Sequence, residues 1–340
     1  MSESVDPRAP RPVDPAGDGR PSRREFIAVG VGALAIAALP RAVKPERRLI
    51  RATRPVMGTL AEIGVVARDP RRARGAMDAA FAELVRVERA MSRFRTDSEI
   101  GRVNAAADGT PVAVSEETLG VVEDALRWAD ASGGGFDPAL GRAAELWSIE
   151  SRTEPPSAVE SRRFADRALW RAVETGRFRG SPVIRLHEPD AALDLGGIAK
   201  GHGVDRAVAA LREWGVTSGM VNVGGDLYAL GESPEGDPWR VGVRDPSRPD
   251  GVSTTFEVVD RAVATSGDYE RFFEHRGRRY HHLLDPRTGE PRSSAIHGVT
   301  VLADDVRTAD VAGTTVFGRD PARARRLVET MAPDVEVRYG

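Results

Sequence analysis

A glycine-rich turn with a single lysine is the segment of the sequence best suited to chemistry. Residues 193–201 read Leu-Asp-Leu-Gly-Gly-Ile-Ala-Lys-Gly, and Lys200 lies where a helix is expected to begin. Glycines let backbone N–H and C=O groups approach a ligand closely, and a helix N-terminus attracts anions. Lys200 adds a charge suited to phosphate. No Ser or Thr follows the lysine, which excludes a Walker A loop; a purely structural strand-to-helix turn is the alternative.

A carboxylate and a hydroxyl stand four residues apart near the C-terminus. Asp310 and Thr314 belong to the run Thr-Ala-Asp-Val-Ala-Gly-Thr. On a helix this spacing places both side chains on one face. Two oxygen donors suit a hard cation such as Mg²⁺, whose other ligands are water and substrate phosphate. The alternative is an Asp near a helix start and a Thr buried against a sheet.

Two histidines precede a third candidate segment. His281 and His282 lie just before Asp-Pro-Arg-Thr-Gly at residues 285–289, a composition typical of a turn. The pair can act as metal ligands, as acid–base groups, or as alternating residues of an edge strand. Arg287 in the turn can hold a phosphate. The residues alone leave these alternatives open.

The elements that must position these groups are mixed in type. Apolar spacing predicts a helix over 77–91, a second from Ser115 to Gly133, a third after Lys200 and two closing helices over 309–317 and 322–331. Strand signals cover 50–67, 219–230, 239–243, 254–263 and 298–302. Helices and strands do not alternate regularly. We therefore expect an α+β fold with antiparallel sheets packed with helices, forming a single globular domain over 47–340.

The composition of the chain argues against nucleic-acid binding and excludes sites built from cysteine. The chain has 340 residues, a formal net charge of −2 and no cysteine. The near-neutral balance gives no indication of nucleic-acid binding. The absence of thiols excludes disulfides, Cys-rich zinc or iron–sulfur sites and a lipoprotein anchor. Any metal must be held by carboxylates, hydroxyls, carbonyls or imidazoles.

The first 46 residues differ from the rest. Residues 2–21 are rich in Pro, Asp, Arg and Gly, a composition that predicts disorder. Arg23 and Arg24 then precede a short apolar run and a small-residue stretch, which is typical of a twin-arginine export signal. We expect a periplasmic or extracytoplasmic protein; a membrane anchor or a core helix is the alternative. A G-x-G-x-x-A pattern inside this run lacks the preceding strand that a dinucleotide site requires.

Several segments together resemble one family. The order of motifs is similar to that of the ApbE family of FAD:protein FMN transferases, and the resemblance extends from about Pro55 to Gly318. The segments that carry it are Met-Gly-Thr at 57–59, Met-Ser-Arg-Phe-Arg-Thr-Asp-Ser-Glu at 91–99, Gly-Gly-Phe-Asp-Pro at 134–138, the Lys200 turn with Asp205, Val-Gly-Gly-Asp at 223–226, Thr-Ser-Gly-Asp-Tyr at 265–269, His-x-x-Asp-Pro-Arg-Thr-Gly from His282, and Thr-Ala-Asp-x-x-x-Thr at 308–314.

The resemblance implies a T-fold-related α+β domain and a set of site residues. FAD, the substrate, would contact Met57, Phe94, Gly135, Phe136, Asp137, Asp194 and Lys200, with Thr265, Ser266, Gly267 and the stretch around Leu283 near the flavin. Mg²⁺ would be held by Asp310, Thr314 and the carbonyl of Gly197. The sequence departs from the family twice, with Phe94 at a position usually occupied by Tyr and Gly197 where Ala is frequent.

The implied reaction is a phosphoryl-type displacement. A Ser or Thr hydroxyl of an acceptor protein, expected to be a membrane or exported redox protein, attacks the FMN-side phosphorus of FAD, and AMP leaves. Mg²⁺ and Lys200 would neutralise the pyrophosphate, and His282 or an aspartate would take the proton. A Mg²⁺-dependent FAD pyrophosphatase and a non-catalytic flavin-binding protein are the rival interpretations. The presence of both Asp310 and Thr314 disfavours the second.

Overall fold

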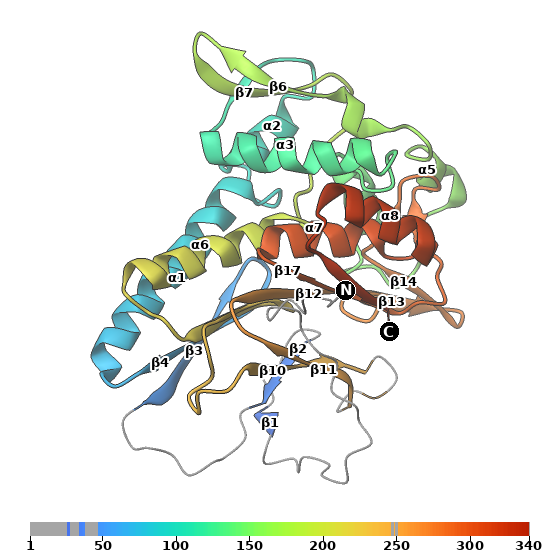
Figure 1. The fold of residues 1–340 in the computed structure, drawn as a ribbon. Coiled ribbons are helices and arrows are strands. Elements are labelled where there is room, and N and C mark those ends of the chain that lie inside the picture. Colours follow the sequence, from blue (N-terminus) through green and yellow to red (C-terminus); the bar gives the residue numbers. More distant parts are fainter. Residues whose placement is uncertain (1–25, 28–33, 38–46, 246–247, 249–250, 340) are drawn as a thin grey trace, which may run out of the picture.

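The computed structural model describes residues 26–27, 34–37, 47–245, 248 and 251–339. A seven-stranded sheet forms its centre, in the order β18-β17-β12-β9-β8-β4-β3. Each neighbouring pair in it is antiparallel. Helices cover one face and a smaller sheet lies on the other (Figure 1). The expected α+β fold with antiparallel sheets is confirmed.

The central strands are buried because helices and a second sheet cover both faces. Every residue of β8, β9 and β17 is buried. The tight turn between β8 and β9 is made by Gly224 and Gly225, both with positive φ. The strands of this sheet are β3 (Arg48–Val56), β4 (Thr59–Ala67), β8 (Gly219–Val223), β9 (Asp226–Leu230), β12 (Arg261–Gly267), β17 (Gly298–Ala303) and β18 (Glu336–Tyr339).

Three helices pack on the face of the sheet that carries the site. They are α1 (Pro70–Met91), α6 (Ala199–Glu213) and α7 (Val306–Val316). The apolar spacing that predicts α1 is confirmed, since Met77, Ala80, Phe81, Leu84, Val87 and Met91 are all buried. In Figure 1, α6 lies between α1 and α7. This arrangement brings the beginning of α6 close to α7.

The opposite face carries a second, smaller core. Strands β10 (Trp239–Arg244) and β11 (Val252–Val258) pair there with each other, and the short strands β1 (Phe26–Ile27) and β2 (Leu34–Ala37) extend the sheet beside β10. The single strand predicted over 254–263 is wrong. Asp260 has a positive φ, and the chain turns there from β11 into β12 of the other sheet. Arg23 and Arg24 lie outside the described residues.

The remaining elements lie beyond the helical layer or at its end. The predicted second helix is confirmed as α3 (Glu116–Ala131), with Ser115 as its N-cap and Gly133 in the left-handed region just after its end. Within the described residues, no helix combines the length and apolar character needed to cross a membrane. The other elements are α2 (Glu99–Ala105), β5 (Val112–Ala113), α4 (Gly141–Trp147), α5 (Ala158–Arg162), η1 (Leu169–Ala172), β6 (Val173–Phe178), β7 (Ser181–Leu186), β13 (Phe272–His275), β14 (Arg278–His281), β15 (Leu284–Asp285), β16 (Glu290–Pro291) and α8 (Pro321–Met331).

Candidate functional site

A partly buried lysine lies between two buried aspartates at the start of α6. The Nζ of Lys200 forms an ion pair with Asp226, the first residue of β9, and lies 3.6 Å from Oδ1 of Asp310 on α7. Both carboxylates are almost fully buried. Burial and the nearby Asp310 raise the pKa of Asp226 to about 7. Burial also raises the pKa of Asp310, although Lys200 opposes this shift.

The same two aspartates keep Lys200 charged. Burial opposes a charge on the ammonium, but Asp226 and Asp310 outweigh it, so the pKa of Lys200 lies above its ordinary value. When all three groups are ionised, one cation faces two anions. The remaining negative charge favours a further cation beside Asp310.

The three residues expected to hold a metal lie together. A Cβ built on Gly197 would be 3.0 Å from Oγ1 of Thr314, which shows how closely the turn approaches α7. Oδ2 of Asp310 accepts a hydrogen bond of 3.0 Å from the amide of Gly201. The donor set is a carboxylate, a hydroxyl and a backbone carbonyl, all oxygens, as Mg²⁺ prefers. The described residues hold no cluster of three or more His, Cys, Asp or Glu side chains that could bind a metal. A site built partly from hydroxyl and carbonyl oxygens does not require one.

The hairpin turn between β3 and β4 packs near Lys200 and adds Met57 to the site. Met57 adopts a positive φ of 54°, uncommon for a residue with a side chain, and its amide donates to Glu88 over 3.0 Å. Its sulfur would lie 3.0 Å from a Cβ placed on Gly203 of α6. The turn therefore packs one helical turn from Lys200. A strained residue fixed by tertiary contacts is common at functional sites.

Arg271 connects that turn to His282. Its guanidinium donates to the carbonyl of Gly58 over 2.9 Å, and its own carbonyl accepts from the amide of His282 over 3.2 Å. The protein atoms packed around part of the ring and the nearby Arg271 cation lower the pKa of His282, although the residue as a whole is exposed to solvent. His282 is therefore a neutral imidazole at neutral pH, able to accept a proton.

The neighbouring His281 has a structural position. It is buried, and its Nε2 lies 2.8 Å from the carbonyl of Arg292, to which it must donate. Its Nδ1 accepts from the amide of Leu283 over 3.2 Å. Burial lowers the pKa of His281, so this ring stays neutral with both nitrogens engaged.

Strand β12 presents its predicted residues to opposite faces. The Oγ of Ser266 lies 3.0 Å from where a Cβ on Gly313 of α7 would be, so this side chain faces the helices. Thr265 points the other way and bonds Oγ1 of Thr300 across the sheet over 3.0 Å. Gly267 packs against the ring of Tyr269. The structure therefore brings the side chain of Ser266, and not that of Thr265, toward α7.

An exposed aromatic ring lies beside the Lys200 turn. Phe94 keeps 75% of its surface exposed, and the Arg93 guanidinium stacks over its ring at 4.1 Å. The Nε of Arg93 is 2.8 Å from the carboxylate of Asp194. Asp194 also accepts from the amide of Gly196 over 2.9 Å, which shapes the turn before α6. The Phe94 ring is therefore available to stack on a planar ligand.

Residues 135–137 join the site through backbone contacts. Phe136 is buried, and Asp137 accepts from the amide of Ala139 over 2.9 Å. Burial raises the pKa of Asp137 to about 6. The carbonyl of Pro138 accepts from the amide of Asp194 over 2.8 Å, so this segment lies against the Lys200 turn.

A partly buried arginine joins three segments of the site by hydrogen bonds. The guanidinium of Arg292 donates to the carbonyls of Gly135, Leu284 and Phe317, and its amide donates to Leu283 over 2.9 Å. Phe317 is the C-cap of α7, where a cation is favourable. Burial lowers the pKa of Arg292 to about 10.

Sequence reasoning did not assign a role to Asp226, Arg271 or Arg292. The Gly-Gly-Asp turn was a signal for Asp226, since a tight hairpin turn beside a glycine-rich helix start can place a carboxylate at the ligand. Arg271 and Arg292 carry no comparable signal. Their roles depend on backbone carbonyls that are distant in sequence.

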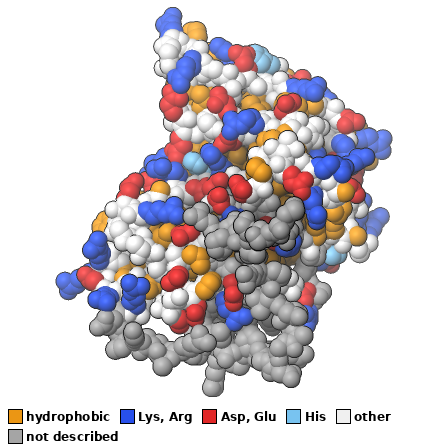
Figure 2. Space-filling model, viewed as in Figure 1, with side chains coloured by type: hydrophobic (Ala, Val, Ile, Leu, Met, Phe, Trp, Pro, Cys, Tyr) orange, Lys and Arg blue, Asp and Glu red, His pale blue; other side chains and the backbone are white. Residues whose placement is uncertain are grey.

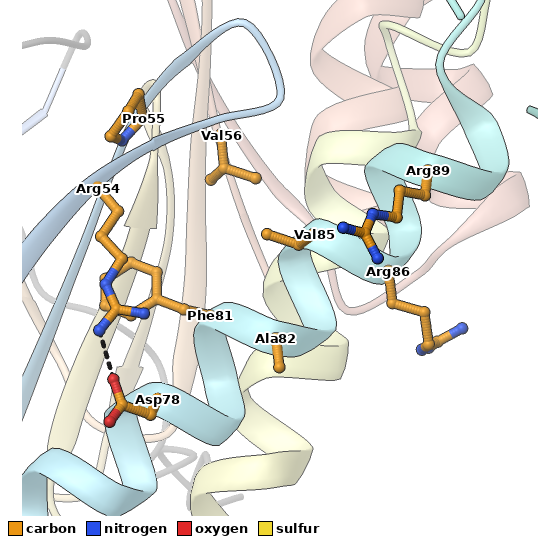
Figure 3. A pocket seen from close by; sticks show the side chains of 9 residues that line it. All are labelled: Arg54, Pro55, Val56, Asp78, Phe81, Ala82, Val85, Arg86 and Arg89. Carbon is orange, nitrogen blue, oxygen red and sulfur yellow. Dashed lines mark hydrogen bonds and ion pairs between the residues drawn. The ribbon is translucent and has the colours of Figure 1, made fainter.

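Two hollows lie outside this cluster. The first, of about 350 Å³, lies between β3 and α1, where Arg54 pairs with Asp78 and stacks over Phe81 (Figure 3). The second, of about 300 Å³, is lined by His202, Asp205, Arg206, Val208, Arg212, Tyr228, Asp304, Asp305 and Arg307. Figure 2 shows acidic and basic side chains interspersed over the described part of one face. That mixture fits the near-neutral net charge.

Comparison with known proteins agrees with this site. The model of the ApbE family matches residues 57–339. A Treponema pallidum protein named FAD:protein FMN transferase is 35% identical over 279 residues, covering 77% of this chain and 76% of that protein.

Solved structures give the same result. The structure of the ApbE protein of Thermotoga maritima superimposes with a TM-score of 0.77 at 30% identity, covering 86% of this chain and 94% of that one. The flavin transferase ApbE of Vibrio cholerae gives 0.73 at 30% identity, covering 86% and 93%. The resemblance in the motifs is thus confirmed, and the chain belongs to the ApbE family.

Proposed function

We propose that this chain transfers FMN from FAD to a Ser or Thr hydroxyl of an acceptor protein and releases AMP, using Mg²⁺. The observation that carries the proposal is the convergence of Lys200, Asp310, Thr314 and Gly197 at the junction of α6 and α7. The names of the relatives, FAD:protein FMN transferase, support the same reaction.

Each group in the site has a chemical task. Asp310, Thr314 and the carbonyl of Gly197 would hold Mg²⁺, which neutralises the pyrophosphate when bound. Lys200 at the start of α6 adds positive charge toward the phosphates, and the helix N-terminus favours the same anion. The exposed ring of Phe94 offers a stacking surface for a planar part of FAD.

The displacement moves one proton and breaks one P–O bond. The acceptor hydroxyl oxygen bonds to the FMN-side phosphorus, while the bond from that phosphorus to the bridging oxygen of AMP breaks. Neutral His282 accepts the hydroxyl proton, and AMP departs with the bridging oxygen. Arg271 keeps His282 in place through its backbone carbonyl.

The test uses purified protein, FAD, Mg²⁺ and an acceptor peptide, followed by mass measurement. The proposal requires that peptide bearing FMN and free AMP increase in equal amounts, and that an Ala at the acceptor hydroxyl abolish labelling. Release of FMN and AMP with an unmodified peptide would instead indicate a pyrophosphatase. Full activity without divalent metal would remove Mg²⁺ from the proposal.

We also propose that the chain is exported by the twin-arginine route and modifies a membrane or exported redox protein. The support is the Arg23-Arg24 pair and the apolar run that follows it. Replacing both arginines by lysine retains the charge but removes the paired guanidinium groups. The variant should accumulate in the cytoplasm; unchanged export would overturn the proposal.

A further inference from the structure

The N-terminal ends of helices α6 and α7 are each hydrogen-bonded by an aspartate of the other helix. Asp205 of α6 accepts the amide of Val306 over 2.8 Å and that of Arg307 over 3.0 Å, the first two residues of α7. In return, Asp310 of α7 accepts the amide of Gly201 in the first turn of α6. Each helix start is thus capped by a side chain of the other helix.

The two helices also touch through their backbones. A Cβ on Gly201 would overlap the carbonyl of Val306, so only glycine permits this approach. Helix α6 has no capping side chain of its own at Ile198, and the bond from Asp310 supplies one. Small rotations of one helix against the other would break these bonds.

Helix α7, by contrast, has a cap of its own. Asp305 accepts the amide of Thr308 over 2.8 Å and the Thr308 hydroxyl over 2.8 Å. The two additional bonds from Asp205 are therefore not needed to begin the helix. They fix where the helix begins relative to α6. Burial raises the pKa of Asp205 to about 7, so this placement is maintained against a desolvation cost.

We propose that Asp205 is a positioning residue that sets α7 against α6 and thereby holds Asp310 and Thr314 opposite Gly197 and Lys200. Within the described residues, the side chain of Asp205 bonds to the amides of Val306 and Arg307 and to none of these four residues. It acts through the amides of Val306 and Arg307, about one helical turn before Asp310. A test of this role by Mg²⁺ binding rests on the proposed function, because it assumes the proposed Mg²⁺ site.

Two matched variants separate positioning from capping. Asp205→Asn and Asp305→Asn each remove one negative charge beside the first turn of α7 and preserve side-chain shape, but only the first weakens the link to α6. Mg²⁺ binding to the purified protein is measured by calorimetry. We expect Asp205→Asn to weaken Mg²⁺ binding about tenfold or more, a change of about 1.4 kcal/mol, and Asp305→Asn to change it less than threefold. Activity at saturating Mg²⁺ should recover to within a few-fold in Asp205→Asn.

A second readout needs no metal. Amide hydrogen exchange at Gly201 reports the bond to Asp310 on the other helix. Asp205→Asn should accelerate exchange at Gly201 at least tenfold, and Asp305→Asn should not. If Asp205→Asn fails to fold, Asp205→Glu, which keeps the charge but displaces it, should show the same two effects.

The outcomes distinguish this inference from the proposed function. Wild-type protein that binds no Mg²⁺ would overturn the metal site, while the exchange measurement would still decide the role of Asp205. Unchanged Gly201 exchange in Asp205→Asn, or equal effects in both variants, would overturn the positioning role even if Mg²⁺ binds as proposed.

Discussion

Replacing Lys200 by methionine should destabilise the metal-free protein in a strongly pH-dependent manner. The substitution keeps the volume of the side chain and removes the cation between Asp226 and Asp310. At an effective dielectric constant of about 20, opposite charges separated by the 3.6 Å of the Lys200–Asp310 pair attract by about 5 kcal/mol. Removing one partner of a buried ion pair typically costs about 3–5 kcal/mol. We expect a loss in this range at pH 8.

The pH dependence follows from the raised carboxyl pKa values. Burial and Asp310 already raise the pKa of Asp226 to about 7, and loss of Lys200 raises it further. A carboxyl of this kind contributes stability that is present below its unfolded pKa of about 4 and is lost as the pH rises through its folded pKa. The penalty of Lys200→Met should therefore be smaller at pH 5 than at pH 8, by up to about 1.4 kcal/mol from Asp226, because only the interval between its folded pKa of about 7 and pH 8 adds to the loss.

Urea denaturation at both pH values, without divalent metal, measures this difference. The double variant Lys200→Met/Asp226→Asn is the control, because it also removes one of the two carboxylates that Lys200 neutralises. It should recover most of the stability at pH 8 and show a weaker pH dependence. An equal loss at pH 5 and pH 8, or no recovery in the double variant, would refute the electrostatic reasoning.

Three further predictions concern turnover and binding. Asp310→Ala should abolish flavin transfer in Mg²⁺ while leaving much of the FAD affinity, and wild-type turnover would exclude this residue as a ligand. His282→Ala should slow transfer by about 100-fold or more with little change in the dissociation constant of FAD; a rate within a few-fold of wild type would remove His282 from proton transfer. Phe94→Ala should weaken FAD binding by about 2- to 10-fold through lost stacking, whereas Phe94→Tyr should not, and titration of FAD distinguishes the two.

Local patterns in the sequence predicted the longer helices α1, α3, α6, α7 and α8 and most strands of the central sheet, but not the shorter elements outside it. The spacing from Met77 to Met91 identified the buried face of α1, and Ser115 and Gly133 marked the ends of α3. These signals depend on residues within a few turns of each other. The boundary at Asp260 was missed because a run rich in β-branched residues does not reveal where the chain leaves one sheet for another.

The site was predictable in part. Asp310 and Thr314 share a helix face, as their spacing predicts, and Thr314 meets Gly197. Strand alternation explains the different positions of Thr265 and Ser266, since neighbouring residues of β12 point to opposite faces. The pairing of Asp205 with Val306, 101 residues away in sequence, leaves no local pattern. Contacts of that kind become visible only when the packing of α6 against α7 is known.

The bonds of Arg292 have a consequence for how the molecule is made. The Arg292 side chain bonds to the carbonyl of Gly135, which is 157 residues away in sequence, and to that of Phe317, which is 25 residues away. Pairings that distant form late, because long loops must close before the contact is gained. A nascent chain that ends before α7 lacks Asp310 and Thr314. It also lacks Phe317 at the end of α7, whose carbonyl accepts a hydrogen bond from Arg292. Synthesis must therefore proceed beyond the end of α7 before the candidate site can form.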